Sequence, residues 1–581
     1  MSRQSRLVTL VLACMTWGPL FSVDVPATWG AGPDSMMADF DALIAAGEFP
    51  PAIELAKKAK SLEQRDQMYA RLARAQAAGG AKQAAISSAR AISNDQYRTE
   101  TLIGLEKPLT ARPGAMGGGV EPDFDQLIDL ITTTIQPESW EELGGPGAIA
   151  PFESGVYVDS KGTLQRAQLR DQSGRLEALR EATSVDSGNR RAAISSPLRK
   201  VSLNRLEREV HLRIAAGEPL DEEMIRLAGI YKLKYVMVYP ETGDVVIAGP
   251  AGKWAPNAEG RIVNVDTQRP TLRLDDFVVV MRNAQRENGR YGCSITPYQE
   301  RLAATQEFLK KSGEKSLSPR QRDQWLEDLR QTLGKQEIEV YGIDADTHVA
   351  RVLVEADYHM KRIGMGLEEG TLEVPSYLEM IKLEPGESPP PMDVLRWWFA
   401  LRYSAIATTK RRDIFEIRGP GVQVLSENEL LEQDGRRVHT GQSSELNETF
   451  AHNFTKRFEA LAKKYPVYAE LQNIFDLTLA AAILEKEKLA ERGDWRQTYF
   501  GAEGRYRPAR LLVAKEVETI MNHRVIDKKH IIAGVSGGVR VDVSEFIDEK
   551  NIEIDEYGVL KADLQASGTP ASLPSEAWWW D

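Results

Sequence analysis

The sequence predicts an α+β multidomain protein with an N-terminal helical segment, a small α/β module and larger mixed α/β domains. A chain of 581 residues is long enough for three or four domains of ordinary size. Two Ala-rich stretches near the N-terminus repeat at a constant offset, which indicates paired helices. In the middle of the chain, segments with helical periodicity flank a β-hairpin pattern. Further along, apolar residues occur at every second position, as in antiparallel strands. Helices and strands therefore both contribute to the fold.

Residues 1–27 read as a secretory signal peptide. Arg3 and Arg6 precede a mostly apolar run over Leu7–Phe21, which has the length of a signal h-region. The run is too short for a spanning helix, which needs about 20 apolar residues. We predict cleavage after Ala27, and hence a secreted or periplasmic protein without a stable membrane span. Lipidation at Cys14 and retention of the segment as an uncleaved anchor remain as alternatives.

The net charge and the cysteine count limit which partners and which covalent cross-links the chain can have. The formal net charge is −12, and an acidic chain argues against a general binder of nucleic acid or anionic membranes, which needs clustered Lys and Arg. Cys14 and Cys293 are the two cysteines, and removal of the signal leaves no intramolecular disulfide. We expect Cys293 to be a small buried apolar side chain.

The segment over 36–105 is predicted to be helical and repeat-like. Gly47 is repeated at Gly80, and Ala52 and Ala56 are repeated at Ala85 and Ala89, always 33 residues later. This period resembles that of tetratricopeptide repeats, although an Ala-rich helical hairpin without a repeat function explains the pattern nearly as well. Residues 106–122, rich in Pro and Gly, are predicted to be a linker.

Two α/β segments follow the linker. Over 123–165, a helical pattern ends at Pro137, and short strands are expected around Ile149 and Val156–Val158. Over 200–335 we predict a second α/β domain, whose hairpin joins apolar strands through Glu241-Thr242-Gly243-Asp244. Later in this domain, Pro297 and Pro319 each follow a Thr or Ser residue that can cap a helix N-terminus. Each pair therefore predicts the start of a helix.

The range 336–560 is predicted to be an α+β domain with antiparallel strands and two long helices. Val349–Gly364 is predicted to be helical, and Phe450, Phe454 and Phe458 recur every four residues as a core stripe. Residues 561–581 read as a disordered tail. Its three tryptophans, Trp578–Trp580, either pack onto the body or contact a partner.

Gly534-Val535-Ser536-Gly537-Gly538 matches the nucleophile elbow of α/β-hydrolases. An elbow places the serine between a strand and a helix, whereas alternating valines after Gly538 predict a second strand. We therefore predict a Gly-rich hairpin. His530 is the last histidine, so the hydrolase order of Ser, acid and His fails as well.

Metal and cofactor sites are not predicted. The seven histidines form no zinc motif, although His348 and His359 share a helix face. Asp344 and Asp346 resemble the start of a calcium loop with Glu355 at its twelfth position, but Val349 occupies the place of the turn glycine. Phosphate-binding loops are missing. Carboxylate pairs such as Asp275-Asp276 are read as solvated surface. We accordingly assign no catalytic, cofactor-binding or metal-ligating residue.

Several stretches resemble a family of uncharacterised secreted proteins of planctomycete bacteria. The likeness covers residues 122–545, and the stretches that carry it are Leu130–Trp140 with Gly144–Gly147, Arg205–Leu227, Tyr235–Pro250, Gly292–Ile295 and Glu355–Lys361. The first of these also resembles part of the periplasmic domains of secretins. The family carries no known activity, and no secretin-like membrane domain follows, so the resemblance implies no pore.

The sequence predicts a non-catalytic binding or assembly component of the cell envelope, with protein partners there. The alternative is an envelope hydrolase of unrecognised type, with its site between the two large domains. A deep cleft that gathers His348, His359 or Ser536 with an acidic partner favours the hydrolase, whereas dispersed polar residues and a large exposed apolar patch favour binding.

Overall fold

The computed structural model describes residues 33–105, 148–152, 155–159, 191–312, 319–382, 393–432, 434, 436–511, 513–526, 529–558, 560, 569–574 and 576–581. The predicted signal peptide, the linker over 106–122 and the helical part of the 123–165 module lie outside them. The chain divides into two compact units, residues 1–105 and 106–581. The predicted α+β class with N-terminal helices is confirmed.

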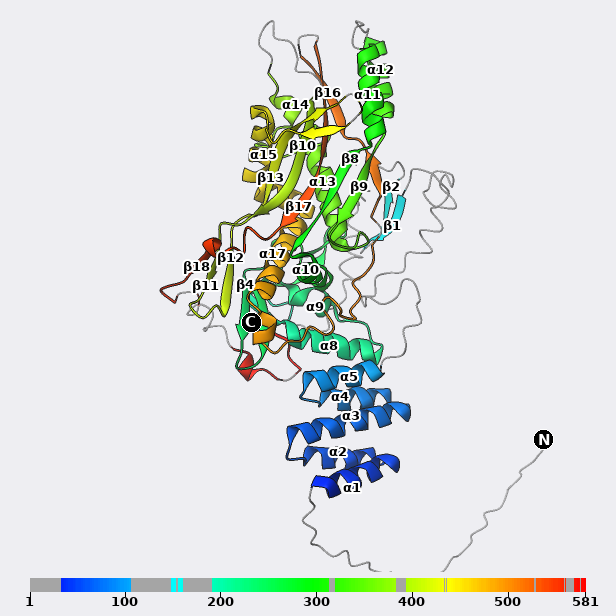
Figure 1. Cartoon of the computed structure of the whole chain (residues 1–581), viewed down its shortest axis with the longest axis vertical. Coiled ribbons are helices and arrows are strands. Elements are labelled where there is room, and N and C mark those ends of the chain that lie inside the picture. Colours follow the sequence, from blue (N-terminus) through cyan, green and yellow to red (C-terminus); the bar gives the residue numbers. More distant parts are fainter. Residues whose placement is uncertain are drawn as a thin grey trace, which may run out of the picture. The chain divides into compact units, whose positions relative to one another are not determined.

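The first unit consists of helices in succession (Figure 1). They are α1 (Pro33–Ala45), α2 (Phe49–Lys57), α3 (Leu62–Ala78), α4 (Lys82–Arg90) and α5 (Asp95–Leu105). Gly47 and Gly80 form the turns of α1–α2 and α3–α4, with φ of 76° and 80°, a region that glycine enters at little cost. Ala52, Ala56, Ala85 and Ala89 are fully buried, so the 33-residue offset corresponds to equivalent positions in two helix pairs.

A larger sheet organises the second unit (Figure 1). Its strand order is β14-β13-β10-β17-β8-β9-β15, and β16 also pairs with β17. The strands are β8 (Arg290–Pro297), β9 (Lys335–Tyr341), β10 (Asp393–Arg402), β13 (Gly421–Leu431), β14 (Arg437–His439), β15 (Glu516–Glu518), β16 (Met521–Ile526) and β17 (Lys529–Asp542). All neighbours are antiparallel except β10 and β17. The sheet thus takes strands from both of the ranges 200–335 and 336–560.

A second sheet has the order β18-β11-β12-β4-β5-β3-β19. Its strands are β3 (Ser196–Ser202), β4 (Tyr235–Tyr239), β5 (Asp244–Ala251), β11 (Ala405–Thr408), β12 (Ile414–Arg418), β18 (Ile552–Ile554) and β19 (Trp579–Trp580). The predicted hairpin is β4–β5. Two further antiparallel pairs are β1 (Ala148–Phe152) with β2 (Gly155–Asp159), as expected for the small module, and β6 (Trp254–Pro256) with β7 (Ile262–Asn264).

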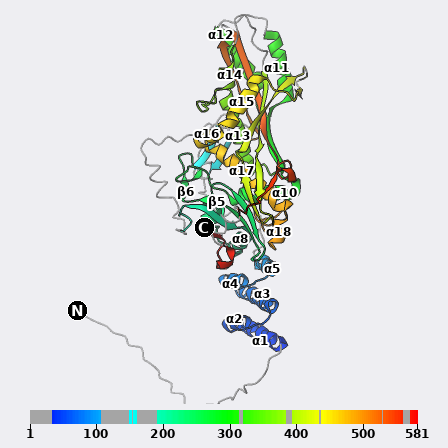
Figure 2. The same ribbon diagram turned by 90° about the vertical axis from the view of Figure 1, so that its left-hand side faces the viewer.

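Helices pack against these sheets and against one another. They are α8 (Leu203–Ala216), α9 (Glu222–Ile225), α10 (Leu274–Glu287), α11 (Gln299–Ser312), α12 (Pro319–Leu333), α13 (His348–Gly364), α14 (Tyr377–Met380), α15 (Glu445–Lys456), α16 (Phe458–Lys464), α17 (Pro466–Lys486) and α18 (Leu489–Arg492). Helix α13 lies against β8, β10 and β17, and α15 against β13; Figure 2 shows this layer turned by 90°. Helix α13 ends at Gly364. A Cβ atom on this residue would lie 2.1 Å from the ring of Trp397, so this close contact requires glycine.

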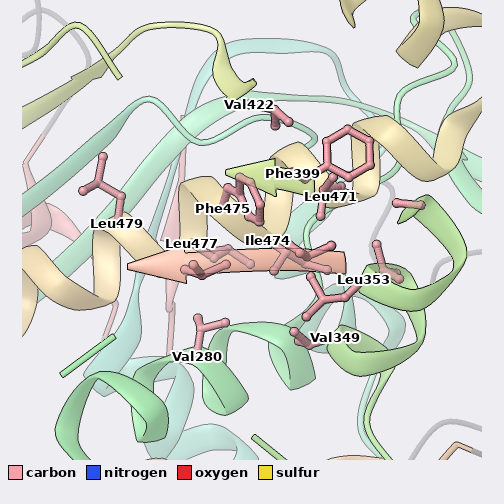
Figure 3. Packing of buried hydrophobic residues seen from close by; sticks show 14 of the residues in the cluster. Val280, Val349, Leu353, Phe399, Val422, Leu471, Ile474, Phe475, Leu477 and Leu479 are labelled. Atoms are coloured by element: carbon pink, nitrogen blue, oxygen red, sulfur yellow. The ribbon is translucent and has the colours of Figure 1, made fainter. Parts of the chain in front are cut away.

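Helix α17 is the centre of the core (Figure 3). It contacts α10, α13 and β13, and side chains such as Leu471 and Phe475 meet Leu353 and Phe399 in one apolar cluster. Over the described residues it is the one helix long and apolar enough to cross a membrane, and its whole apolar window is buried. A helix that is apolar on all sides is typical of a protein interior. The predicted stripe of Phe450, Phe454 and Phe458 is buried in the same cluster.

Two local predictions are wrong. The Gly-rich segment 534–538 does not turn, because β17 runs through it as one strand. The range 561–581 is not a disordered tail throughout: Trp579–Trp580 form β19 against β3, and all three terminal indoles are buried. Burial of three large apolar rings compensates the loss of chain entropy.

Candidate functional site

Two adjoining polar hollows in the second unit share His348 and Glu470. They lie where the N-terminal ends of α10 and α13 meet α17. Thr347 caps α13 by accepting a hydrogen bond from Ala350 N, which places His348 in the first turn. The first hollow is lined by Arg226, Ile262, Pro270, Thr271, Leu272, Arg273, Asp276, His348, Glu470, Asn473 and Leu477. The second is lined by Arg261, His348, Arg351, Val352, Glu355, Glu470 and Leu511.

His348 and Asp276 form the central pair of this site. His348 Nδ1 lies 2.9 Å from Asp276 Oδ1 and 3.0 Å from Oδ2. Burial lowers the pKa of His348, and the positive charges of Arg273 and Arg351 lower it further, although Asp276 opposes them. The ring is therefore neutral at neutral pH. Its Nδ1–H donates to the carboxylate, which leaves Nε2 as the acceptor nitrogen, the arrangement of an oriented general base.

Arg261 closes one wall of the second hollow. It is 4% exposed and forms ion pairs with Glu355 of α13 and Glu470 of α17. One guanidinium thus joins two helices that are distant in sequence, and fixes the walls of the site. Two carboxylates share this one guanidinium, so the three groups together carry a net charge of −1 when all are ionised.

Two buried polar atoms point to bound water. Thr271 and Asn473 line the first hollow at 5% and 4% exposure. Within the described part of the chain, no hydrogen-bond partner reaches Thr271 Oγ1 or Asn473 Oδ1. Each hollow leaves about 10 Å³ for the centre of a water molecule, room for about one water. In this conformation the site can hold water beside a histidine base, but not a sizeable organic substrate.

Ser536 lies elsewhere, on β17. Its hydroxyl donates to Glu429 Oε2 at 3.0 Å. Glu429 also pairs with Arg437 at 3.1 Å, and His439 Nδ1 lies 3.2 Å from Glu429 Oε1. The carboxylate therefore stands between serine and histidine, whereas a hydrolytic triad needs the imidazole in that place. The elbow interpretation has neither its strand–helix geometry nor its base.

The remaining sequence candidates occupy further places in the core. His359 Nδ1 lies 2.7 Å from the hydroxyl of Tyr468 on α17. Cys293 is 2% exposed, and burial raises the pKa of its thiol far above the ordinary value, so the expectation of a small buried side chain is confirmed. Glu355 pairs with Arg261, away from any calcium loop, and among the described residues no cluster of ligating side chains could hold a metal ion.

Asp357 and Lys361 form a fully buried ion pair on the sheet-facing side of α13. Lys361 Nζ lies 2.6 Å from Asp357 Oδ2 and donates to Ile295 O at 3.3 Å. Burial raises the pKa of Asp357 and lowers that of Lys361, while each charge opposes the shift of the other. The pair links α13 to β8 inside the apolar cluster, which is a structural role.

Sequence reasoning missed Asp276. The pair Asp275-Asp276 was expected on the solvated surface, but both are buried, at 9% and 5% exposure. Asp275 accepts a hydrogen bond from Tyr506 at 2.7 Å, and Asp276 holds His348. Their position in the first turn of α10, directly before the apolar residues from Phe277 onward, was the available signal, since carboxylates are favoured at a helix N-terminus.

A family model matches part of the second unit. Residues 293–377 match the model of a protein family of unknown function, DUF1598. The matched range begins in β8, contains α11 to α13, and includes His348, Glu355 and the Asp357–Lys361 pair. No curated protein and no solved structure matches the chain. This part of the second unit is therefore similar to a domain of unknown function.

Proposed function

We propose that this chain is a secreted or periplasmic protein that acts as a non-catalytic binding or assembly component of the cell envelope. The observation that carries the proposal is the pair of equivalent helix hairpins in the first unit. Arrays of stacked helix pairs present an extended surface, and such surfaces commonly bind other proteins. The resemblance to secreted planctomycete proteins and the predicted signal peptide support the compartment.

The first helices of the two pairs mark the surface to be tested. Arg71 of α3 pairs with Asp41 of α1 at 2.8 Å, and both side chains are about half exposed. The two helices therefore present one continuous face, to which Arg74 also belongs as an exposed residue of α3. Reversing exposed charges of this kind would place like charges opposite each other at an interface, which weakens binding.

Capture from envelope extracts tests the proposal. The full chain is immobilised, and proteins retained by it are compared with those retained by the double variant Arg71→Glu/Arg74→Glu. Lys57→Glu/Lys58→Glu, at the C-terminal end of α2 and the residue after it, is the matched control, because it also reverses two exposed charges and also breaks one exposed ion pair, with Glu54. We expect at least about tenfold less partner with the α3 variant and little change with the control. Equal retention by both variants, or no retained protein with the unmodified chain, contradicts the proposal.

A hydrolase is the second candidate, and the Asp276–His348 pair is the observation that favours it. A neutral histidine oriented by a carboxylate beside a water-sized hollow can take a proton from water. Activity is measured on peptide, ester and glycan substrates. Under this hypothesis His348→Asn lowers turnover by about 10²-fold or more, while His452→Asn, on the exposed side of α15, leaves it unchanged. Turnover that survives His348→Asn removes this candidate.

A further inference from the structure

The edge of β3 holds an extended segment of the same chain. Trp579 and Trp580 pair antiparallel with Val201 and Lys200, and Ser202 N–H donates to Trp578 O at 2.8 Å. The three indoles are 5–9% exposed, and Trp580 packs with Met237, Val246 and Ala248. The segment is thus bound by strand addition to a sheet edge, and the alternate side chains Trp579 and Trp580 pack into two different apolar clusters.

Arg199 recognises the acidic residue of this segment. Its guanidinium is fully buried and donates to both carboxylate oxygens of Asp581, at 2.8 and 3.2 Å. It also donates to the carbonyls of Ala192, Ala228 and Ile194, at 2.7 to 2.8 Å. The same guanidinium lies 4.6 Å from the centre of the Trp579 ring. The surrounding carbonyls fix the arginine fork before a carboxylate arrives, which is the feature of a preorganised acid-binding site.

Arg205 holds the backbone of the segment. It donates to the carbonyls of Pro570, Pro574 and Ala577, at 3.2 to 3.4 Å, and is itself anchored to buried Asp244 at 2.7 Å. These contacts are made to backbone carbonyls of a stretch that begins with the short 3-10 helix Pro570–Ser572 and turns again between Pro574 and Ala577, so they hold its backbone and do not depend on side-chain identity. The tryptophans and Asp581 supply the specificity.

The pairing of β3 within the sheet does not depend on this segment. β19 has two residues, whereas β3 keeps its pairing with β5 from Ser196 to Ser202. Departure exposes the Arg199 fork and an unpaired strand edge. An edge of this kind readily pairs with another chain, and the matching sequence is present in every copy of the protein.

We propose that the β3 edge is a peptide-binding groove that also accepts residues 569–581 of a second copy, so that two chains exchange these segments. Identical contacts form within one chain or between two, and the balance depends on protein concentration. The inference extends the proposed assembly role to a self-partner. It is tested with purified chain alone, so its failure is distinguishable from the failure of capture by the first unit.

Complementing variants test the exchange. Trp579→Ala/Trp580→Ala disables the segment and keeps the groove, while Arg199→Glu disables the groove and keeps the segment. Each variant alone is expected to be monomeric by light scattering, and their mixture to form a one-to-one dimer. Adding Asp581→Lys to the Arg199→Glu chain should abolish that dimer. The segment of this chain would then bring a lysine cation, instead of a carboxylate, to Arg199 in the groove of the Trp579→Ala/Trp580→Ala chain.

Binding of a synthetic peptide tests the groove directly, and this measurement does not depend on whether the Arg199→Glu variant folds. A labelled synthetic peptide of residues 569–581 is titrated into the Trp579→Ala/Trp580→Ala chain, whose fold is checked by circular dichroism. We expect binding at least about tenfold tighter than to the unmodified chain, whose own segment competes, and none with the Asp581→Lys peptide. No binding to the folded variant overturns the groove. Binding of the peptide without a mixed dimer of folded chains overturns the exchange.

Discussion

Ser536 Oγ on β17 donates a hydrogen bond to Glu429 Oε2 on β13 at 3.0 Å, across the intervening strand β10 of the large sheet. The serine is 2% exposed and the side chain of Glu429 is fully buried. The glutamate is also contacted by Arg437 and His439, so the hydroxyl is one donor in a charged cluster on β13, β14 and β17. Ser536 therefore has a structural role in the fold, as a hydrogen-bond donor to a buried carboxylate.

Replacing Ser536 with Ala should lower stability. The substitution removes a donor to a buried carboxylate, and hydrogen bonds to charged groups contribute about 1.5–3 kcal/mol. Urea unfolding of Ser536→Ala is compared with that of Ser426→Ala, which breaks a neutral hydroxyl pair with Ser443 at 2.8 Å. We expect the control to lose about 0.5–1.5 kcal/mol. Equal losses would contradict a charge-assisted bond at Ser536.

The two glycines Gly534 and Gly537 should differ sharply in their tolerance of alanine. A Cβ at Gly537 would lie 1.7 Å from the carbonyl oxygen of Trp397 on β10, whereas a Cβ at Gly534 meets nothing within 4 Å among the described residues. Gly537→Ala should therefore cost more than about 4 kcal/mol or prevent folding, and Gly534→Ala should change stability by less than about 1 kcal/mol. Thermal unfolding of both variants gives the comparison. A tolerated Gly537→Ala would show that β10 and β17 can separate.

The Asp357–Lys361 pair should show strong coupling. Lys361→Met leaves a fully buried carboxylate without its cation and should cost about 3–5 kcal/mol. The double variant Asp357→Leu/Lys361→Met removes both charges and should recover most of that loss, because a buried pair is often replaceable by apolar side chains. Chemical denaturation of the single and double variants completes the cycle. Losses that simply add would mean that the two charges do not interact.

Asp476 should make stability depend on pH. Burial raises its pKa to about 6 from the ordinary 3.8, although the hydrogen bond from Tyr403 at 2.8 Å opposes the shift. Because the folded-state pKa lies above the unfolded one, this group stabilises the fold fully below pH 3.8, and the contribution is lost as pH rises through about 6. The loss is about 3 kcal/mol for two pKa units.

Asp476→Asn removes this dependence. Between about pH 4 and pH 7 the free energy of unfolding of the Asn variant should rise relative to the unmodified chain by about 3 kcal/mol. Glu556→Gln, which removes an exposed carboxylate, controls for the loss of one charge. If the difference in unfolding free energy between the unmodified chain and the Asp476→Asn variant stayed constant with pH, the pKa of Asp476 would be the ordinary one.

Local patterns in the sequence were sufficient for individual elements. The helix predicted over Val349–Gly364 is α13, and the β4–β5 hairpin follows from its turn residues. The buried phenylalanine stripe and the paired helices of the first unit follow in the same way. The helix, the hairpin and the stripe depend on residues close together in the sequence, and the paired helices depend on a repeat of 33 residues; both spacings are visible in the sequence.

Contacts between distant residues were decided by the tertiary structure. His348 meets Asp276 across 72 positions, and Asp581 meets Arg199 across 382. Gly537 allows β10 to approach β17, so the glycines that predicted a turn instead permit a continuous strand. By itself the sequence determined the fold class and most local elements through periodicity. Which polar residues share a buried site depends on how the sheets and helices pack, because the desolvation of a charge is settled only by neighbours from elsewhere in the chain.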